Sequence, residues 1–315
     1  MEEKKLREKM QALIDTLLPA ARAYYQESRE IMSNLEYDSA YDELKRLEEE
    51  SGIVLSGSPT QSVGYEVLSS LPKVTHEQPM LSLDKTKSVD ELISWLGNQK
   101  ALLSWKMDGL TIVLRYRDGA LYQAVTRGNG YIGELVTGTV RAFRNVPLRI
   151  PFKGELLLRG EALMRYSDFE RINAELPETE AKYKNPRNLC TGTVRQLDPA
   201  VTAARGVYFH AFSLVEAEGV EFNNSRAAQF AWLRDQGFEV VEYETVTAAT
   251  LRDSVLRFES KIPKNDFPSD GLVLLLDDIA YGESLGRTAK FPRNAIAFKW
   301  QDEQAETVLR EIEWS

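Results

Sequence analysis

The hydrophobic pattern of this chain changes its period between residues 55 and 68, and this change constrains the fold more than any other feature. Before it, apolar side chains recur at three- and four-residue steps, which is typical of amphipathic helices. They are Leu6, Met10, Leu13, Ile14, Leu17, Leu18 and Ala21, followed by Tyr37, Tyr41, Leu44 and Leu47. The sequence therefore predicts one helix over about 3–27 and a second up to about residue 50, joined by a short polar turn in which Ser33 or Asn34 caps the second helix.

Beyond the Gly-, Ser- and Pro-containing linker candidate at 56–64, apolar residues form short runs. These predict strands, largely antiparallel, at 101–105, 110–116, 120–126, 155–164, 207–215, 271–276, 295–300 and 308–314. Asp118-Gly119 predicts a tight hairpin, because the favoured turn needs positive φ at both positions. Helices are predicted at 168–175, with a Ser167/Glu170 capping box, and at 226–236, ending before Gly237. The fold class is therefore α+β, with a helical hairpin at 1–64 and an antiparallel-sheet domain flanked by helices at 65–315.

Charge and cysteine content exclude several classes of protein. Lys plus Arg number 39 against 48 Asp plus Glu, a net charge of −9, so any contact with nucleic acid must come from a local patch. The single cysteine, Cys190, permits no internal disulfide and no four-cysteine zinc site. The first residues are not a signal peptide, and the longest apolar run, 271–276, is far below the ~18 residues that a membrane span needs. We expect a cytoplasmic monomer that does not enter a membrane.

Lys106-Met107-Asp108-Gly109, at the end of a predicted strand, is the main candidate for chemistry. A lysine amine becomes a nucleophile when burial or nearby cations lower its pKa, and Asp108 could orient it or accept its proton. A surface lysine before a tight turn is the commoner interpretation of so short a motif.

Three further segments carry cations. Residues 126–130 (TRGNG) suit a ribose hydroxyl or a phosphate, or form an ordinary hairpin loop. Residues 159–161 (RGE) could hold sugar hydroxyls or form an exposed ion pair of little consequence. Residues 182–195 contain four cations and no acid, and this patch is either a solvated loop or a contact for phosphates.

These segments, in this order, resemble the bacterial NAD-dependent DNA ligases, specifically their N-terminal helical module and adenylation (nucleotidyltransferase) domain. The resemblance covers nearly the whole chain. Its most specific motifs are SPTQ (58–61), HEQPMLSLD (76–84), KMDG (106–109), TRG (126–128), RGE (159–161), NPRN (185–188), RQLDP (195–199) and AFK (297–299).

The resemblance implies an enzyme that uses NAD as an adenylate donor, with Mg²⁺ as a cofactor. Lys106 would attack the α-phosphorus of NAD, expel nicotinamide mononucleotide (NMN) and pass the AMP to the 5′-phosphate of nicked double-stranded DNA. Positions implied for the AMP half are Arg127 and Glu161 on the ribose, Phe212, Ser82 and Leu83 at the adenine, and Lys299 on the α-phosphate. Positions implied for NMN are Tyr24, Tyr25, Asn34, Tyr37 and Asp38, and those implied for DNA phosphates are Arg187 and Arg195.

The chain departs from the family's pattern at four positions. Ser104 replaces a glutamate that reads the adenine amino group, and Leu275 replaces the second lysine of a DGxVxK strand. Asn34 replaces an aspartate of the nicotinamide site, and the usual RGDG loop reads RGNG here. We therefore expect looser adenine readout and the loss of one phosphate-binding cation, for which Lys290 could partly compensate.

Three functions follow as hypotheses. The preferred one is a working ligase, because Lys106, Asp108, Arg127, Glu161 and Lys299 are all retained. The second is a catalytically weakened paralogue with a regulatory or scaffolding role in DNA repair. The third is an ATP-dependent or RNA-directed nucleotidyltransferase, against which the helical module argues. Since the family continues beyond the position of Ser315, the chain is expected to be a fragment or a naturally short protein.

Overall fold

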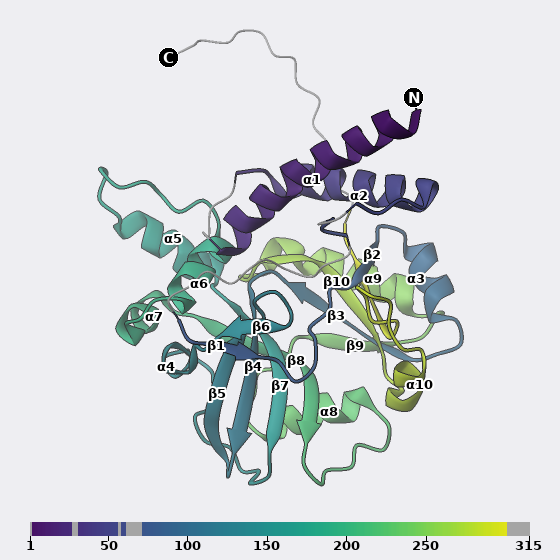
Figure 1. The fold of residues 1–315 in the computed structure, drawn as a ribbon. Coiled ribbons are helices and arrows are strands. Elements are labelled where there is room, and N and C mark those ends of the chain that lie inside the picture. The colour runs from purple at the N-terminus through teal and green to yellow at the C-terminus, as the bar shows by residue number, and fades with distance from the viewer. Residues whose placement is uncertain (1, 27–30, 56–57, 61–70, 301–315) are drawn as a thin grey trace.

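The computed structural model describes residues 2–26, 31–55, 58–60 and 71–300 (Figure 1). The strand predicted at 308–314 and the predicted boundary between residues 64 and 65 lie outside the described residues. Within the described part of the chain, no helix is both long and apolar enough to span a membrane.

The N-terminal helices form the predicted hairpin from α1 (Glu2–Gln26) and α2 (Asn34–Ser51). Their apolar stripes meet in a small core of their own, made by Met10, Ile14, Leu17, Leu44 and Leu47. Ser33 caps α2, since its hydroxyl accepts the Glu36 N–H while the Glu36 carboxylate accepts the Ser33 N–H. The sequence stripe therefore identified the residues that pack the hairpin.

Part of the predicted linker is fixed on the hairpin. The Ser58 hydroxyl donates to Glu48 at 2.5 Å, and the Thr60 hydroxyl donates to the other oxygen of the same carboxylate. Glu48 on α2 is 6% exposed, so these hydroxyls supply the hydrogen bonds that a buried carboxylate requires.

The rest of the chain is built on two main sheets (Figure 1). The five-stranded sheet has the order β2-β11-β10-β3-β9, and all its pairs are antiparallel except β2 with β11. The four-stranded sheet, β5-β4-β7-β8, is antiparallel throughout, and β1 pairs with β6 separately. The strands are β1 (Lys73–Thr75), β2 (Asp84–Thr86), β3 (Ala101–Met107), β4 (Leu110–Arg117), β5 (Ala120–Thr126), β6 (Ile132–Glu134), β7 (Leu156–Leu163), β8 (Tyr208–Ala217), β9 (Tyr243–Val246), β10 (Ser269–Leu276) and β11 (Ala295–Phe298).

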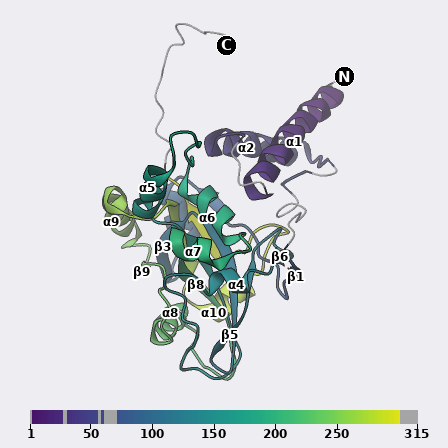
Figure 2. The same cartoon turned by 90° about the vertical axis from the view of Figure 1, so that its left-hand side faces the viewer.

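Helices surround these sheets, and the hairpin lies across one end of the domain (Figures 1 and 2). One large apolar core, separate from that of the hairpin, joins the sheets to the helices. The helices are α3 (Val89–Leu96), α4 (Thr137–Val140), α5 (Tyr166–Glu175), α6 (Pro186–Val194), α7 (Pro199–Arg205), α8 (Arg226–Asp235), α9 (Leu251–Lys261), the 3₁₀ turn η1 (Ile262–Lys264) and α10 (Ile279–Ser284). The predicted α+β class, with a helical module followed by mainly antiparallel sheets, is confirmed.

Local signals were right at the β4–β5 turn and at α8, and wrong at α5. Asp118 and Gly119 both have positive φ, at 50° and 75°, and α8 ends before Gly237 as predicted. The predicted Ser167/Glu170 capping box is not formed, because α5 begins at Tyr166. Instead, the backbone N–H and the hydroxyl of Ser167 donate to the carboxylate of Asp266, at 2.9 and 2.6 Å. A carboxylate that is distant in sequence therefore replaces the local cap.

Candidate active site

A cleft of about 2090 Å³ is lined by both main sheets, α2 and α6. Each of the sequence motifs quoted for the family resemblance contributes at least one residue to its lining. The sequence-predicted residues that line it are Tyr37, Asp38, Ser82, Leu83, Ser104, Lys106, Asp108, Arg127, Glu161, Arg187, Arg195, Phe212, Leu275, Lys290 and Lys299.

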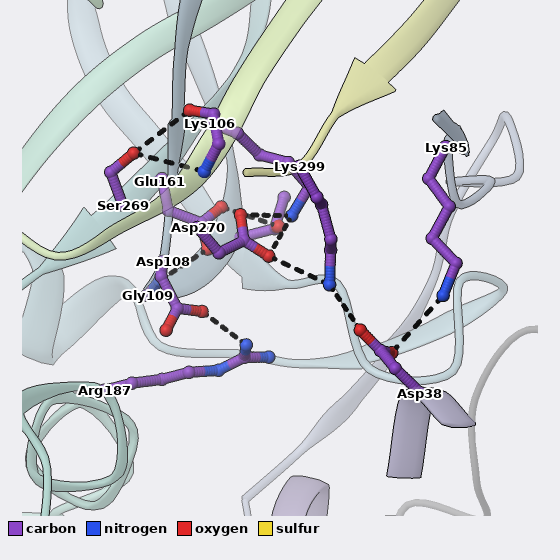
Figure 3. Close-up of polar contacts among 12 residues, drawn as sticks. Asp38, Lys85, Lys106, Asp108, Gly109, Glu161, Arg187, Ser269, Asp270 and Lys299 are labelled. Atoms are coloured by element: carbon purple, nitrogen blue, oxygen red, sulfur yellow. Dashed lines mark hydrogen bonds and ion pairs between the residues drawn. The ribbon is translucent and has the colours of Figure 1, made fainter. Parts of the chain in front are cut away.

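Lys106 lies near the end of β3, with its amine held by Asp270 (Figure 3). Its Nζ donates to both carboxylate oxygens of Asp270, at 2.7 and 2.8 Å. Burial opposes ionisation of Asp270, but Lys106 and Lys299 outweigh it, so the pKa of Asp270 falls below its usual value. Asp270 is thus an ionised acceptor placed directly on the candidate nucleophile.

The backbone around Asp270 is irregular, and this irregularity requires a glycine. The register of β10 against β3 shifts between Ser269 and Gly271, and Gly271 has a φ of 150°. A Cβ at Gly271 would lie 2.0 Å from the carbonyl oxygen of Phe298. The bulge at Asp270 therefore depends on a residue without a side chain.

Lys299 connects the same site to the hairpin. Its Nζ lies 3.5 Å from Asp270 and donates to Asp38 of α2 at 2.7 Å. Burial would lower the pKa of Lys299, but Asp270 and Asp38 raise it above its ordinary value, so the amine is held as a cation.

The sequence suggested that Asp108 could orient Lys106 or accept its proton. In the structure its carboxylate instead accepts a hydrogen bond from the guanidinium of Arg187, in the first turn of α6. The glycine of this segment, Gly109, is required by close packing, since a Cβ there would lie 2.0 Å from the Ala162 carbonyl oxygen. Its N–H donates to Glu161 at 3.1 Å. The KMDG segment therefore ties β3 to β7 as well as presenting the lysine.

Glu161, on β7, faces the cleft from the four-stranded sheet. It accepts the Gly109 N–H on one oxygen and the Thr111 hydroxyl on the other, at 2.8 Å. Burial raises its pKa to about 7, although the Thr111 hydrogen bond, Arg187 and Lys106 favour the charged form.

This shift predicts a pH dependence of stability. Between pH 4.5 and about 7 the folded chain keeps a proton on Glu161 that the unfolded chain releases, so stability decreases as pH rises through this window. The full loss is about 3 kcal/mol. Glu161→Gln is expected to remove this decrease, which denaturant unfolding of both proteins from pH 4.5 to 8 will show. Parallel pH profiles for the two proteins would contradict the assignment.

Residues implied for the AMP half lie together in the cleft. Arg127 donates to the Ser82 hydroxyl at 3.0 Å, and Leu83 and Phe212 line the same cleft. Ser104 is 7% exposed and stands opposite Val273 in the sheet register. Their individual contacts with a nucleotide stay predictions.

Leu275 is half-buried, lines the cleft and is paired with Leu102 and Ala295. The cleft surface at this point is therefore apolar. Lys290, the expected compensating cation, contacts the hairpin instead: its Nζ lies 3.8 Å from the centre of the Tyr41 ring and 3.4 Å from the Pro59 carbonyl oxygen. Burial lowers its pKa to about 8.

The structure describes the side chains of both residues expected at DNA, but of only two of the five residues expected at NMN. Arg187 and Arg195 line the cleft and bind acids of the chain, Asp108 and the buried Glu134 respectively, so their contact with DNA stays a prediction. Tyr37 and Asp38 face the cleft from α2. Tyr24, Tyr25 and Asn34 belong to the hairpin helices, but their side chains lie outside the described atoms.

Three residues of the site were not predicted from the sequence: Asp270 as the partner of Lys106, Thr111 as the partner of Glu161, and Lys85 at the hairpin. Asp270 had a signal, because it opens the same Asp-Gly strand in which Leu275 was noted. Lys85 directly follows the HEQPMLSLD motif, in a three-residue strand too short to show a period.

The described residues contain no group of three or more acidic, His or Cys side chains able to hold a metal ion. Magnesium usually binds through one or two carboxylates together with substrate phosphates, and two carboxylates of the cleft are Asp270, which binds the candidate nucleophile, and Asp108, two residues after it in the sequence. We keep Mg²⁺ as a prediction and assign no step to it.

A cleft between the two main sheets, with a lysine held by an acid on one sheet and the buried carboxylate of Glu161 on the other, is the arrangement expected of lysine-dependent nucleotidyltransferases. Residues 68–303 match the NAD-dependent DNA ligase adenylation domain family, and residues 3–64 match the DNA ligase-like, N-terminal NAD⁺-binding domain. The chain therefore belongs to the NAD-dependent DNA ligases.

Individual relatives agree with this family. The chain is 62% identical over 309 residues to a DNA ligase of Lachnoclostridium phytofermentans, covering 98% of this chain and 47% of that protein. It is 61% identical over 306 residues to a DNA ligase of Ruminiclostridium cellulolyticum, covering 97% and 47%. An archaeal ATP-dependent RNA ligase (form 2) aligns over 81% of this chain and 64% of its own, at 11% identity and a TM-score of 0.42, which is too low for the fold to depend on it. The chain spans about half the length of the relatives in the first two comparisons.

Proposed function

We propose that this chain performs the self-adenylation step of an NAD-dependent DNA ligase. The observation that carries the proposal is the position of the Lys106 amine, bound by Asp270 on the cleft surface, with Lys299 beside the same carboxylate. NAD is a substrate here, since its adenylate half is transferred.

The reaction begins with loss of a proton from the Lys106 ammonium, and Asp270, which accepts two of its hydrogen bonds, is placed to receive it. The amine then forms an N–P bond to the α-phosphorus of NAD. The bond from this phosphorus to the bridging oxygen breaks, and its electron pair leaves with NMN. Lys299 holds negative charge that develops on the phosphates, and Glu161 accepts hydrogen bonds from the ribose.

The later steps belong to the whole protein, of which this chain spans about half when compared with its relatives. We propose that the AMP passes to the 5′-phosphate of nicked DNA, with Arg187 and Arg195 near the DNA backbone. The family assignment and the chemistry of the lysine support this proposal. A cytoplasmic location and a monomeric state stay predictions.

Intact mass tests the function directly. Incubation with NAD and Mg²⁺ is expected to add one AMP to the chain. Incubation with ATP is expected to add none, because ATP lacks the nicotinamide half that the cleft-lining hairpin residues Tyr37 and Asp38 are proposed to bind. Labelling by ATP alone would support an ATP-dependent enzyme. No labelling by either would support the weakened paralogue.

Leu275→Lys is expected to accelerate AMP transfer. A lysine stem can lie over Leu102 and Ala295 while its amine reaches the cleft, and one added cation at a transferring phosphate is typically worth about 10²–10³ in rate. Single-turnover transfer from NAD measures this effect, with Leu275→Met as the uncharged control. An unchanged or lower rate in a folded Leu275→Lys protein would mean that this leucine serves only the packing of the sheet.

A further inference from the structure

Three lysines lie on the cleft surface of the five-stranded sheet. Lys106 is on β3, and Lys85 on β2 is paired with Ala297 of β11. Lys299 is two residues after Ala297, so Lys299 and Ala297 point to the same face of the five-stranded sheet. Lys85, Ala297, Val273 and Ser104 are successive register partners across the sheet, and all four line the cleft. Lys85 is therefore a cleft residue, although its strand is at the sheet edge.

The side chains form a continuous chain of alternating charge (Figure 3). Its order is Lys106, Asp270, Lys299, Asp38 and Lys85, with Asp42 also bound to Lys85 at 3.1 Å. Asp38 lies between two lysines: one oxygen is 2.7 Å from Lys299 Nζ, and the other is 3.5 Å from Lys85 Nζ. Two oxygens of one phosphate have nearly the same separation as those of a carboxylate. Lys85 and Lys299 thus form a two-cation anion site that the Asp38 carboxylate fills.

The net charge of these side chains matches a particular ligand. Lys106, Lys299 and Lys85 carry three positive charges and Asp270 one negative charge, so these four side chains together carry a net charge of +2. The two acids that neutralise this charge, Asp38 and Asp42, both come from the hairpin. The pyrophosphate of a dinucleotide carries two negative charges and can replace them.

We propose that Lys85 binds the phosphate of the nicotinamide half of NAD, after that phosphate displaces Asp38 from the two lysines. This inference rests on the proposed function. Lys85 is the lysine farthest along the charge chain from Lys106 and the one held by two hairpin acids, so it lies on the side of the leaving half of the dinucleotide. Lys299 then serves both phosphates.

The test compares two inhibitors of self-adenylation from NAD, NMN and nicotinamide riboside, which differ only by the phosphate. In the whole wild-type chain, NMN is expected to inhibit more strongly. Lys85→Gln is expected to raise the KM for NAD on the order of 10–100-fold and to weaken inhibition by NMN while leaving that by nicotinamide riboside unchanged. Lys45→Gln is the control, because Lys45 also joins the hairpin to β2, through Asp84 at 3.8 Å, and should leave both inhibitors and the KM unchanged.

Other results decide against the proposal. Equal weakening of both inhibitors in Lys85→Gln would mean that Lys85 only docks the hairpin, and an unchanged KM would mean that it contacts nothing in NAD. Equal inhibition of the wild-type chain by both compounds would show that no residue holds this phosphate. A wild-type chain that NAD does not label at all would instead overturn the proposed function.

Discussion

Lys106→Ala is expected to abolish the attachment of AMP to the chain from NAD. Lys299, the other described amine beside Asp270, is bound more closely to Asp38, and removal of the Lys106 amine removes the atom that forms the N–P bond. The fold should persist, because Asp270 retains Lys299 as a partner and the Lys106 side chain is 28% exposed. Intact mass after NAD treatment gives the result.

Two further variants complete the experiment. Lys106→Arg keeps a cation on Asp270 but offers no comparable nucleophile at neutral pH, so it should also remain unlabelled and should keep the stability of the parent. Lys100→Ala, just before β3, should be labelled normally. AMP on the alanine variant of Lys106 would show that another residue is the nucleophile.

Removal of residues 1–60 is expected to eliminate reaction with NAD while leaving AMP binding in the remaining domain. The hairpin supplies Tyr37, Asp38 and Asp42 to the cleft, whereas Lys106, Glu161 and Phe212 come from the sheets. The main apolar core contains no hairpin residue, so the truncated chain should fold. Intact mass after incubation with NAD measures the transfer of AMP to the truncated chain. Calorimetry measures its binding of AMP.

A point variant makes the same test within the intact chain. Tyr37→Ala should weaken NAD binding by about 1–3 kcal/mol. Full reactivity of the truncated chain with NAD would exclude the hairpin as the clamp for the leaving half.

Sequence reasoning performed best where structure is local. The stripe that includes Met10, Ile14 and Leu17 identified the hairpin core, and Asp118-Gly119 identified a turn, because both depend on residues close along the chain. It failed at Ser167, where the acceptor is Asp266, a residue 99 positions away. It also omitted β1, β2, β6 and β9, each only three or four residues long, because such strands cannot display a period.

In the candidate site, too, the contacts that were not predicted join residues that are distant in the sequence. The motifs placed Lys106, Glu161 and Lys299 in one cleft, as expected from the family resemblance. The partner of Lys106 was assigned to Asp108, two residues away, whereas the structure supplies Asp270 from a neighbouring strand. Lys85 was absent from the predicted site because its place on the cleft surface follows from a parallel pairing with β11, more than 200 residues later in the chain. Pairings of this kind are not encoded in any short segment.

The separation of the two apolar cores has a consequence for product release. The contacts of the hairpin with the rest of the described chain include ion pairs and cation–aromatic contacts, such as Asp38 with Lys299 and Tyr41 with Lys290. Water and dissolved ions can replace such contacts one at a time, whereas an apolar seam must open with its whole hydrophobic cost. The hairpin can therefore lift away from the cleft with both cores intact, and the ease of this movement, and with it the escape of NMN, should increase with ionic strength.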